Sequence, residues 1–405
     1  MILEGKKIVL GVTGGIAAYK AVDLCSKLVQ AGVEVDVIMT EAATHFVRPL
    51  PFQTISRRPV SLDMFQLLRD TDMAHISLAE KANLLVIAPA TANTIAKLAH
   101  GLADNLLTST ALATTAPILL APAMDADMWA NAATQRNVAL LRERGVLLVG
   151  PAYGRLASGR IGQGRLAPIE DILAAMRQTL GRNGPLAGLH VTVTAGGTQE
   201  PLDPVRHLGN RSSGRMGYAL AEAARDAGAQ VRLISAPTCL PRVYGVETVA
   251  VRTAAEMHHA VVEALATTDV LVMAAAVADY RPATMATQKI KKQEGELILR
   301  LERTVDILAD VARRRDARHP QIVVGFAAET EDLLRNAEAK LRAKQLDLLV
   351  ANDVSAADSG FEVETNRVIL LTPDGVRQQL PLLTKFEVAE RIVQRIAEIR
   401  EAPHD

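Results

Sequence analysis

The chain has 405 residues, more than the roughly 250–300 at which a single hydrophobic core stops growing, so two domains are expected. Apolar residues make up 49 % of the chain and aromatic residues only 3 %, so both cores should be built from aliphatic side chains. The 45 basic and 45 acidic residues balance, which argues against a dedicated nucleic-acid-binding protein.

Cysteine content and hydropathy indicate the compartment. The two cysteines, Cys25 and Cys239, form neither a disulfide framework nor a zinc motif. The first dozen residues already contain a strand and a glycine turn, which leaves no room for a signal peptide. No apolar run is long enough to span a membrane. We therefore expect a cytoplasmic protein that binds neither membranes nor nucleic acid.

Short apolar runs alternate with amphipathic segments along residues 1–180, a pattern typical of βαβ units and a parallel sheet. A helix is expected over residues 17–32, ending at Gly32. Strands buried on both faces are expected at five places, which are residues 6–12, 33–40, 82–90, 116–123 and 146–151.

Residues 181–190 combine Gly, Asn and Pro after a helix, so they are predicted to link a domain of residues 1–180 to one of residues 191–405. The pattern then restarts, with strands expected at residues 189–197, 230–237, 269–279, 322–329 and 347–353. The fold class predicted is α/β, with two doubly wound, mostly parallel, Rossmann-like domains. Ligands should bind beyond the carboxyl ends of the strands.

The first expected strand ends in the turn Thr13-Gly14-Gly15-Ile16, which opens a helix. Glycines let backbone N–H groups approach a phosphate, and a helix N-terminus favours negative charge. Alone this signal is weak, and it does not fit the G-x-G-x-x-G pattern of dinucleotide sites.

Longer motifs are more specific. They are MTEAA at 39–43, His75 in MAHISLAE, APATANTIAKLAHGLADNLLT at 88–108 and PAMDADMW at 122–129. In order and spacing they resemble the flavin-dependent cysteine decarboxylases, which bind FMN in homotrimers and oxidise the substrate thiol so that the carboxylate is lost. The resemblance implies that His75 is the active-site histidine. It also implies an FMN site made of Gly14, Gly15, Thr40, Thr91, Asn93 and Thr94.

Two positions depart from that family. Asp125 replaces the asparagine of the P-x-M-N-x-x-M-W motif, and Ser158 in ASGRIGQGRL replaces a cysteine. The family asparagine hydrogen-bonds the substrate carboxylate, and an ionised aspartate cannot donate in its place. The family cysteine supplies a proton when the enethiol intermediate is reduced, and a hydroxyl is a weaker acid than a thiol. We expect FMN binding to be retained, with slow turnover or arrest at the enethiol.

The second half contains AGGTQEPLDPVRHLGNRSSGRMG at 195–217, AAAVADYRP at 274–282 and KIKK at 289–292. Gly, Ser and Arg suit phosphate and carboxylate contacts. Over about residues 188–400 the sequence resembles the phosphopantothenate–cysteine ligases. That family activates 4′-phosphopantothenate with CTP as an acyl-cytidylate, releases pyrophosphate, and lets the cysteine amine attack.

The resemblance assigns a role to each matching residue. Lys289 should stabilise the leaving pyrophosphate, whereas Lys291 and Lys292 could be only a solvated run. Asn210 should hold the acyl carbonyl, and Arg206 a substrate phosphate or carboxylate. Mg²⁺ should bridge the triphosphate. The remaining nucleotide contacts are Ser212, Ser213, Ala275, Asp279, Asp306, Phe326, Lys340 and Lys344. Thr304 and Val305 replace the family's Asn-Pro before Asp306, so a modest effect on CTP binding is expected.

The leading interpretation is thus a bifunctional coenzyme A enzyme that uses CTP, Mg²⁺ and FMN. The alternatives are a ligase whose flavin domain has become mainly a scaffold, and a flavin-fold binding or regulatory module. By resemblance the protein should be a homo-oligomer, with trimers through the flavin domain and dimers through the ligase domain giving a dodecamer. The choice between CTP and ATP stays open.

Overall fold

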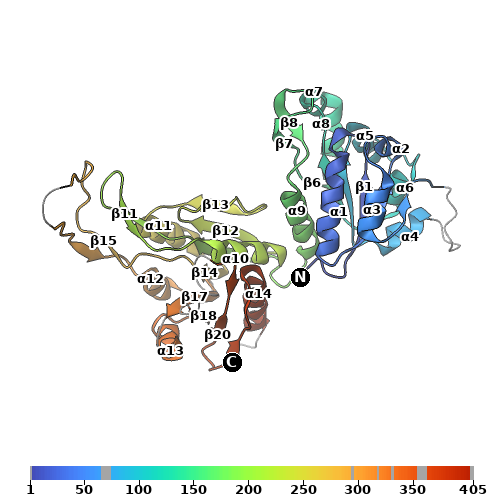
Figure 1. The fold of residues 1–405 in the computed structure, drawn as a ribbon. Coiled ribbons are helices and arrows are strands. Elements are labelled where there is room, and N and C mark those ends of the chain that lie inside the picture. Colours follow the sequence, from blue (N-terminus) through green and yellow to red (C-terminus); the bar gives the residue numbers. More distant parts are fainter. Residues whose placement is uncertain are drawn as a thin grey trace. The chain divides into compact units, whose positions relative to one another are not determined.

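The computed structural model describes residues 2–64, 74–292, 296–316, 319–329, 333–353 and 363–401. The chain divides into two compact units, Met1–Leu180 and Gly181–Asp405 (Figure 1). Each unit is an α/β fold around its own sheet, so each is described by itself.

The first unit contains a six-stranded parallel sheet in the order β3-β2-β1-β4-β5-β6. Its strands are β1 (Lys7–Val12), β2 (Glu34–Met39), β3 (Val60–Ser61), β4 (Leu84–Ala90), β5 (Ile118–Pro122) and β6 (Leu147–Leu148). The chain winds outward from β1 in one direction and then from β4 in the other. The switch between β1 and β4 opens a crevice at the carboxyl ends of these strands.

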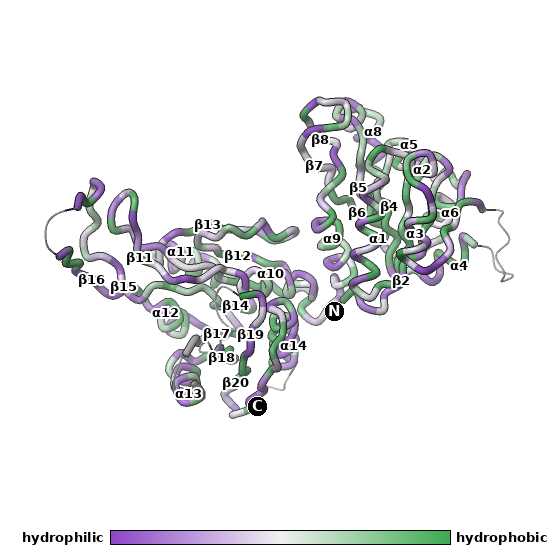
Figure 2. Tube along the Cα trace, in the orientation of Figure 1, coloured by the Kyte–Doolittle hydropathy of each residue, from purple (hydrophilic) through white to green (hydrophobic). Residues whose placement is uncertain are grey.

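Helices cover both faces of this sheet (Figure 1). They are η1 (Ile16–Tyr19), α1 (Lys20–Gln30), α2 (Glu41–Thr44), α3 (Pro49–Ser56), α4 (Ala74–Lys81), α5 (Ala92–His100), α6 (Leu106–Ala113), α7 (Ala126–Ala130), α8 (Ala132–Glu143) and α9 (Ile169–Gly181). On one face, Val9, Leu85 and Ile87 pack against residues of α5, α6 and α8. The strands are apolar along nearly their whole length because both faces are buried (Figure 2).

The second unit contains an eight-stranded sheet in the order β13-β12-β9-β14-β17-β18-β20-β21, antiparallel only at its last two pairings. Its strands are β9 (His190–Ala195), β12 (Gln230–Ser235), β13 (Glu247–Ala250), β14 (Val270–Met273), β17 (Ile322–Glu329), β18 (Leu348–Asp353), β20 (Val368–Leu371) and β21 (Arg377–Gln379). The winding direction changes between β9 and β14, as it does between β1 and β4 in the first unit.

The helices of this unit are α10 (Arg215–Asp226), α11 (Ala254–Ala264), η2 (Leu265–Thr267), α12 (Ile307–Arg314), α13 (Leu333–Ala343) and α14 (Lys385–Glu401). Residues of α10 and α14 such as Leu220 and Ile392 pack on one face of the sheet. Residues of α11, α12 and α13 such as Val261, Val311 and Leu341 pack on the other. The unit is therefore a three-layer α/β/α fold.

Four short strand pairs lie outside the two sheets. They are β7 (Ala152–Arg155) with β8 (Ile161–Arg165), β10 (Gln199–Pro201) with β11 (His207–Gly209), β15 (Tyr280–Pro282) with β16 (Leu301–Arg303), and β19 (Thr365–Asn366) with β22 (Leu383–Thr384). The sequence patterns did not predict these pairs, because strands of two to five residues carry little periodicity.

The predicted fold class is confirmed, since both units are doubly wound and mostly parallel. Residues 181–190, predicted as a linker, pack within the second unit: Leu186 and Leu189 are buried in its core. Their apolar side chains explain this, because a solvated linker would expose them. Across the described residues, none of the helices has the length and apolar character that crossing a membrane requires.

Candidate active sites

The crevice of the first unit is a cavity of about 1200 Å³ at the carboxyl ends of β1, β4 and β5. Segments distant in sequence line it, including the turn after β1, the start of α5, the end of β5 and the β7–β8 hairpin. All residues predicted for FMN lie along it, namely Gly14, Gly15, Thr40, Thr91, Asn93 and Thr94. The two departures, Asp125 and Ser158, line the same cavity.

Local hydrogen bonds hold the walls of this cavity together. The Thr13 hydroxyl donates to the Pro89 carbonyl over 2.6 Å and accepts from the Thr91 N–H over 3.1 Å, so the β1 and β4 turns move as one. Thr91 also caps α5 by accepting from the Thr94 N–H. Gly14 passes so close to Ala42 that an added Cβ would lie 2.8 Å from the Ala42 carbonyl carbon.

Positive charge in this cavity fits a phosphate. Lys20 and Arg165, which the motifs did not single out, both line it. Burial, and then the charge of Arg165, lower the pKa of Lys20 from its usual value. Two cations, several hydroxyls and the capped start of α5 form a donor set that suits a phosphate-bearing flavin such as FMN.

The two altered positions contact each other directly. The Ser158 hydroxyl donates to Oδ2 of Asp125 over 2.7 Å. Oδ1 of Asp125 accepts from the Asp127 N–H over 3.2 Å, which makes Asp125 the cap of α7. The hydrogen bond from Ser158 and that from the backbone of Asp127 lower the pKa of Asp125 below its ordinary value. Asp125 is therefore ionised at neutral pH, and the hydroxyl proton of Ser158 points at it.

His75 does not line this cavity within the described part of the chain. It lies in α4, and its Nδ1 is buried with no hydrogen-bond partner among the described residues. Its predicted catalytic role stays a prediction. His75 was singled out by its motif, but the position of α4 in the first unit does not bring it to the crevice.

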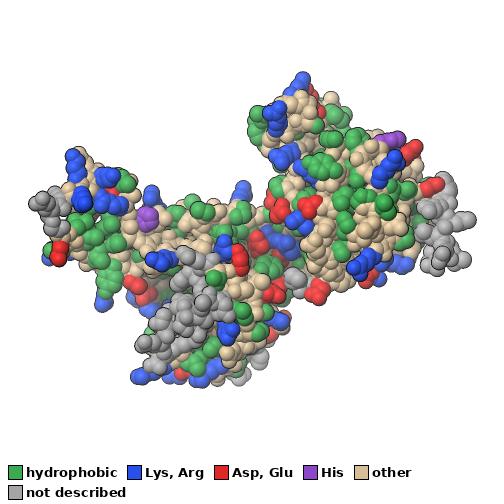
Figure 3. Space-filling view, viewed as in Figure 1, with side chains coloured by type: hydrophobic (Ala, Val, Ile, Leu, Met, Phe, Trp, Pro, Cys, Tyr) green, Lys and Arg blue, Asp and Glu red, His purple; other side chains and the backbone are tan. Residues whose placement is uncertain are grey.

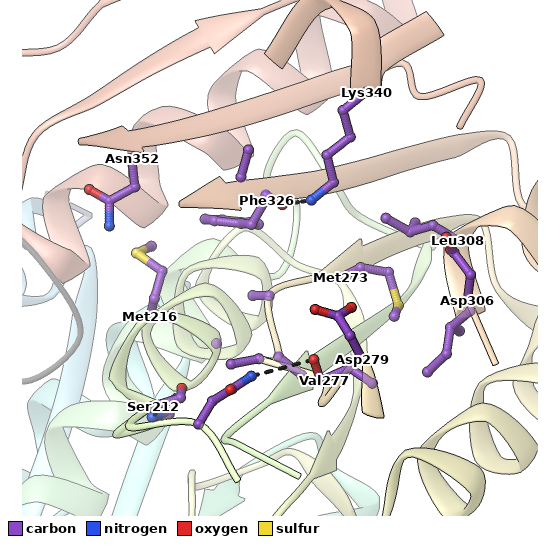
Figure 4. Close-up of a pocket in the computed structure, with 18 of the residues that line it drawn as sticks. Ser212, Met216, Met273, Val277, Asp279, Asp306, Leu308, Phe326, Lys340 and Asn352 are labelled. Atoms are coloured by element: carbon purple, nitrogen blue, oxygen red, sulfur yellow. Dashed lines mark hydrogen bonds between the residues drawn. The ribbon is translucent and has the colours of Figure 1, made fainter. Parts of the chain in front are cut away.

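The crevice of the second unit is a cavity of about 710 Å³ (Figure 4). It lies at the carboxyl ends of β14, β17 and β18 and at the start of α10. Most residues predicted for the ligase line it, namely Asn210, Ser212, Ser213, Ala275, Asp279, Asp306, Phe326, Lys340 and Lys344. Figure 4 shows the Asp279 carboxylate pointing into this space, facing Phe326 and Lys340.

Backbone hydrogen bonds join the loop after β9 to the loop after β14. The Ala276 N–H donates to the Gly196 carbonyl over 2.8 Å, and the Thr198 N–H to the Ala276 carbonyl over 3.2 Å. The Asn210 amide donates to the Val277 carbonyl over 3.4 Å. Asn210 thus lies beside the β14 loop.

The other end of this cavity is built from side chains of α12 and α13. Lys340 donates to the Phe326 carbonyl over 2.7 Å, and Lys344 pairs with Asp306. Burial raises the pKa of Asp306, but the Lys344 hydrogen bond, the Ala309 N–H and the nearby lysine charges together lower it below its usual value. The turn that lacks the family proline is held by Thr304, whose hydroxyl donates to the Ala278 carbonyl over 2.6 Å.

Two predicted residues, Arg206 and Lys289, do not line this cavity within the described part of the chain. Asp203 accepts from the Ile290 N–H over 3.1 Å, and Arg206 donates to the Ile290 carbonyl, so this segment lies along the β10–β11 hairpin. Lys289 is exposed there. The expected convergence of Asn210 and Lys289 on one cavity is therefore not seen within a single chain, and the role of Lys289 stays a prediction.

Figure 3 shows Lys and Arg side chains gathered over the end of the second unit that carries β15. Their neighbours on that segment include the exposed residues Lys289, Lys291 and Lys292. No group of three or more His, Cys, Asp or Glu side chains among the described residues could hold a metal ion. Motif reasoning also assigned no role to several polar residues of the cavity, including Arg215, Arg303, Asn352, Asn366 and Lys385.

Fold and sites together define a two-domain α/β enzyme with a nucleotide-sized cavity at the winding switch of each sheet. Comparison with known families agrees. Residues 2–181 match the family described as flavoprotein, and residues 186–399 match the DNA/pantothenate metabolism flavoprotein C-terminal domain.

Curated relatives match along the whole chain. The coenzyme A biosynthesis bifunctional protein CoaBC of Bacillus subtilis is 46 % identical over 98 % of both chains. The protein of the same name from Escherichia coli K12 is 44 % identical, again over 98 % of both chains. A solved structure of the C-terminal domain of a CoaBC protein is 40 % identical, with a TM-score of 0.47, and covers 54 % of this chain and 98 % of that chain.

The chain therefore belongs to the family of bifunctional coenzyme A biosynthesis proteins. The prediction of a bifunctional enzyme with a flavoprotein half is confirmed. The alternatives, a ligase with a scaffold domain and a regulatory module, are not favoured by relatives that match both halves at this identity.

Proposed function

We propose that the second unit joins 4′-phosphopantothenate to cysteine with CTP, and that the first unit decarboxylates the product with FMN to give 4′-phosphopantetheine. One observation supports the ligase half above all: residues from α10, α12, α13, β17 and the β9 and β14 loops, chosen from sequence motifs, line one cavity. In this assignment residues 1–180 form the decarboxylase domain and residues 191–405 the ligase domain.

In the ligase half, the substrate carboxylate attacks the α-phosphorus of CTP and pyrophosphate leaves. Asn210, fixed by Val277, is placed to donate its second amide hydrogen to the acyl oxygen. Ser212, Ser213 and the start of α10 face the phosphates, where N–H groups and the helix dipole favour negative charge. The cysteine amine then attacks the acyl carbon, and CMP and a proton leave.

Nucleotide recognition would fall to the other end of the cavity. Phe326 offers an apolar surface to the base, and Lys340 and Lys344 supply positive charge. Mg²⁺ would be held mainly by the triphosphate. Asp279 and Asp306 are the carboxylates of the cavity that would assist in binding it. Parallel assays with CTP and ATP test the nucleotide preference.

In the flavin half, Lys20, Arg165, Thr91 and the Gly14-Gly15 turn would hold the FMN phosphate. Bound FMN supplies reversible two-electron oxidation of the substrate thiol, which makes the carboxylate labile. Asp125 and Ser158 line the same cavity and would contact the substrate carboxylate and the enethiol there. Asp125 caps α7 and orients Ser158 through its Oδ2.

One coupled assay tests both halves. Pyrophosphate release should require CTP, phosphopantothenate and Mg²⁺, and release of carbon dioxide should then require cysteine and a yellow, FMN-loaded protein. As a control for the ligase half, Asn210→Ala should lower pyrophosphate release while carbon dioxide release from added phosphopantothenoylcysteine is unchanged. Absence of CTP-dependent pyrophosphate release in the wild type would overturn the assignment.

The assembly and compartment are also proposals. Trimers through the first unit and dimers through the second would give a dodecamer, which is measurable by light scattering. A cytoplasmic location agrees with a thiol, Cys25, that is buried and unpaired.

A further inference from the structure

One corner of the ligase cavity is polar, buried and unexplained by the sequence motifs. It is formed by Asn352 at the end of β18, Asn366 of β19 and Lys385 at the start of α14. Their exposed fractions are 8 %, 2 % and 6 %. Figure 4 shows the Asn352 side chain projecting from its strand toward Met216 of α10. Asn and Lys are rarely buried to this extent.

Two hydrogen-bond acceptors in this corner have no partner in the described structure. They are the Oδ1 atoms of Asn352 and Asn366, both shielded from solvent. Buried carboxamide oxygens normally accept hydrogen bonds, and leaving them unpaired is costly. Both residues line the cavity, so a ligand that carries N–H donors would satisfy them.

The same corner carries the buried ammonium group of Lys385, which lines the cavity. Burial, and then the charge of Arg215, lower the pKa of Lys385 from its usual value. An anionic ligand in the cavity could pair with this ammonium group. A fully ionised phosphate group could do so, but it carries no hydrogen-bond donor for the two orphan oxygens.

We propose that Asn352, Asn366 and Lys385 form the subsite for the amino-acid substrate: the two carboxamide oxygens accept from its amine, and the Lys385 ammonium pairs with its α-carboxylate. An α-amino acid carries both groups on one carbon, which matches a corner with acceptors and a cation side by side. This inference rests on the ligase function proposed above and adds to it the binding mode of cysteine.

The arrangement also suits the chemistry of amide formation. A neutral amine that donates two N–H groups to Asn352 and Asn366 keeps its lone pair free for the acyl carbon. The new N–C bond forms as the bond from that carbon to the CMP oxygen breaks, and one of the two amine protons passes to water. Orientation of a nucleophile in this way is a large contribution to rate.

The first experiment separates the two half-reactions in the full-length protein. Pyrophosphate release in a single turnover without cysteine reports formation of the acyl-nucleotide, and hydroxylamine captures this species without needing an amino-acid site. In Asn366→Leu and Lys385→Met both signals should persist. The KM for cysteine should rise about 10- to 100-fold, as expected for loss of one hydrogen bond to a charged group. Gln378→Ala, in the exposed strand β21, is the control and should leave every signal unchanged.

The second experiment uses substrates in place of variants. Cysteamine has the amine and thiol of cysteine but lacks the carboxylate. The wild type should use cysteine about 10- to 100-fold better, judged by kcat/KM. In Lys385→Met this preference should fall toward one, and Lys385→Arg should recover part of it. A change in overall structure would not alter the ratio of two substrates in this way.

Three results would overturn the inference. One is a wild type that uses cysteamine as well as cysteine. Another is a Lys385→Met variant that keeps the wild-type preference. The third is a set of variants in which CTP or pyrophosphate binding weakens while the KM for cysteine is unchanged, which would assign the corner to the triphosphate. Loss of pyrophosphate release in the wild type would refute the ligase function itself.

Discussion

Restoring the family residues at Asp125 and Ser158 should accelerate the flavin half-reaction. In this chain the Ser158 hydroxyl donates to Asp125 over 2.7 Å, so its proton is directed away from a substrate. The lowered pKa of Asp125 keeps the carboxylate ionised throughout the neutral range, where it repels the substrate carboxylate. A thiol with an ordinary pKa of about 8.5 is a far better proton donor than a hydroxyl.

The expected size of the effect follows from these contacts. A positioned general acid contributes about 10²–10⁴-fold to a proton-transfer step. Water can enter the cavity from its open side, so the gain from Ser158→Cys should lie near the lower limit, about 100-fold. Asp125→Asn keeps the cap of α7, since asparagine accepts from the Asp127 N–H as well. It should act mainly by lowering the KM for phosphopantothenoylcysteine.

Stopped-flow absorbance and product mass measure the two effects separately. Bleaching of the flavin reports thiol oxidation, and the return of colour without oxygen reports the reductive step. The enethiol is lighter than 4′-phosphopantetheine by two hydrogens. The wild type should bleach and recover slowly, whereas the double variant should recover quickly. If the wild type already recovers as fast as the double variant, the reasoning about Ser158 is wrong.

Further predictions concern packing, reactivity and pH. Gly14→Ala would place a Cβ 2.8 Å from the Ala42 carbonyl carbon and should destabilise the first unit by about 1–3 kcal/mol with loss of bound FMN, whereas the Cβ of Gly15→Ala meets only Thr91 at 3.7 Å and should leave thermal stability unchanged. Burial raises the pKa of the Cys25 thiol to about 11, so iodoacetamide should label only the exposed Cys239 in the native protein and both cysteines in urea; rapid native labelling of Cys25 would contradict this. The pKa of Asp306 is lowered in the folded state, so its contribution is present above the unfolded pKa of about 3.9 and lost as pH falls through the lower folded value. Asp306→Asn should therefore cost up to about 1 kcal/mol at pH 7 in urea unfolding, from loss of the Lys344 pair, and little at pH 2–3, since asparagine keeps the α12 cap; an equal cost at both pH values would refute the ionic contribution.

Much of the fold could be predicted from hydrophobic runs. The central strands β1, β4, β9 and β17 were found because each is a short and mostly apolar segment. The edge strand β21 was missed because its three residues are all exposed and polar. Strand β20 was missed because the prediction followed the alternation of strands and helices in βαβ units. This strand pairs antiparallel with β18 and lies outside that alternation.

The sites show a similar division. Residues in motifs next to strand ends, such as Gly14 and Asp279, line a cavity because topology brings strand ends together. Lys289 and His75 lie on elements whose direction depends on tertiary contacts, such as the bond from Ile290 to Asp203. Asn352 and Asn366 belong to no motif, and only their buried Oδ1 atoms without partners among the described residues reveal the corner that they share with Lys385.

The hydrogen bonds that join Gly196 and Thr198 to Ala276 have an evolutionary consequence. An insertion or deletion in either loop would shift the other loop as well, and Asn210 with it, so the wall that handles the acyl group can change only as a whole. The opposite end of the cavity is assembled from single side chains on α12 and α13, which can be exchanged one at a time. Replacements such as Val305 can therefore accumulate there, and nucleotide preference can change while the wall that handles the acyl group stays the same.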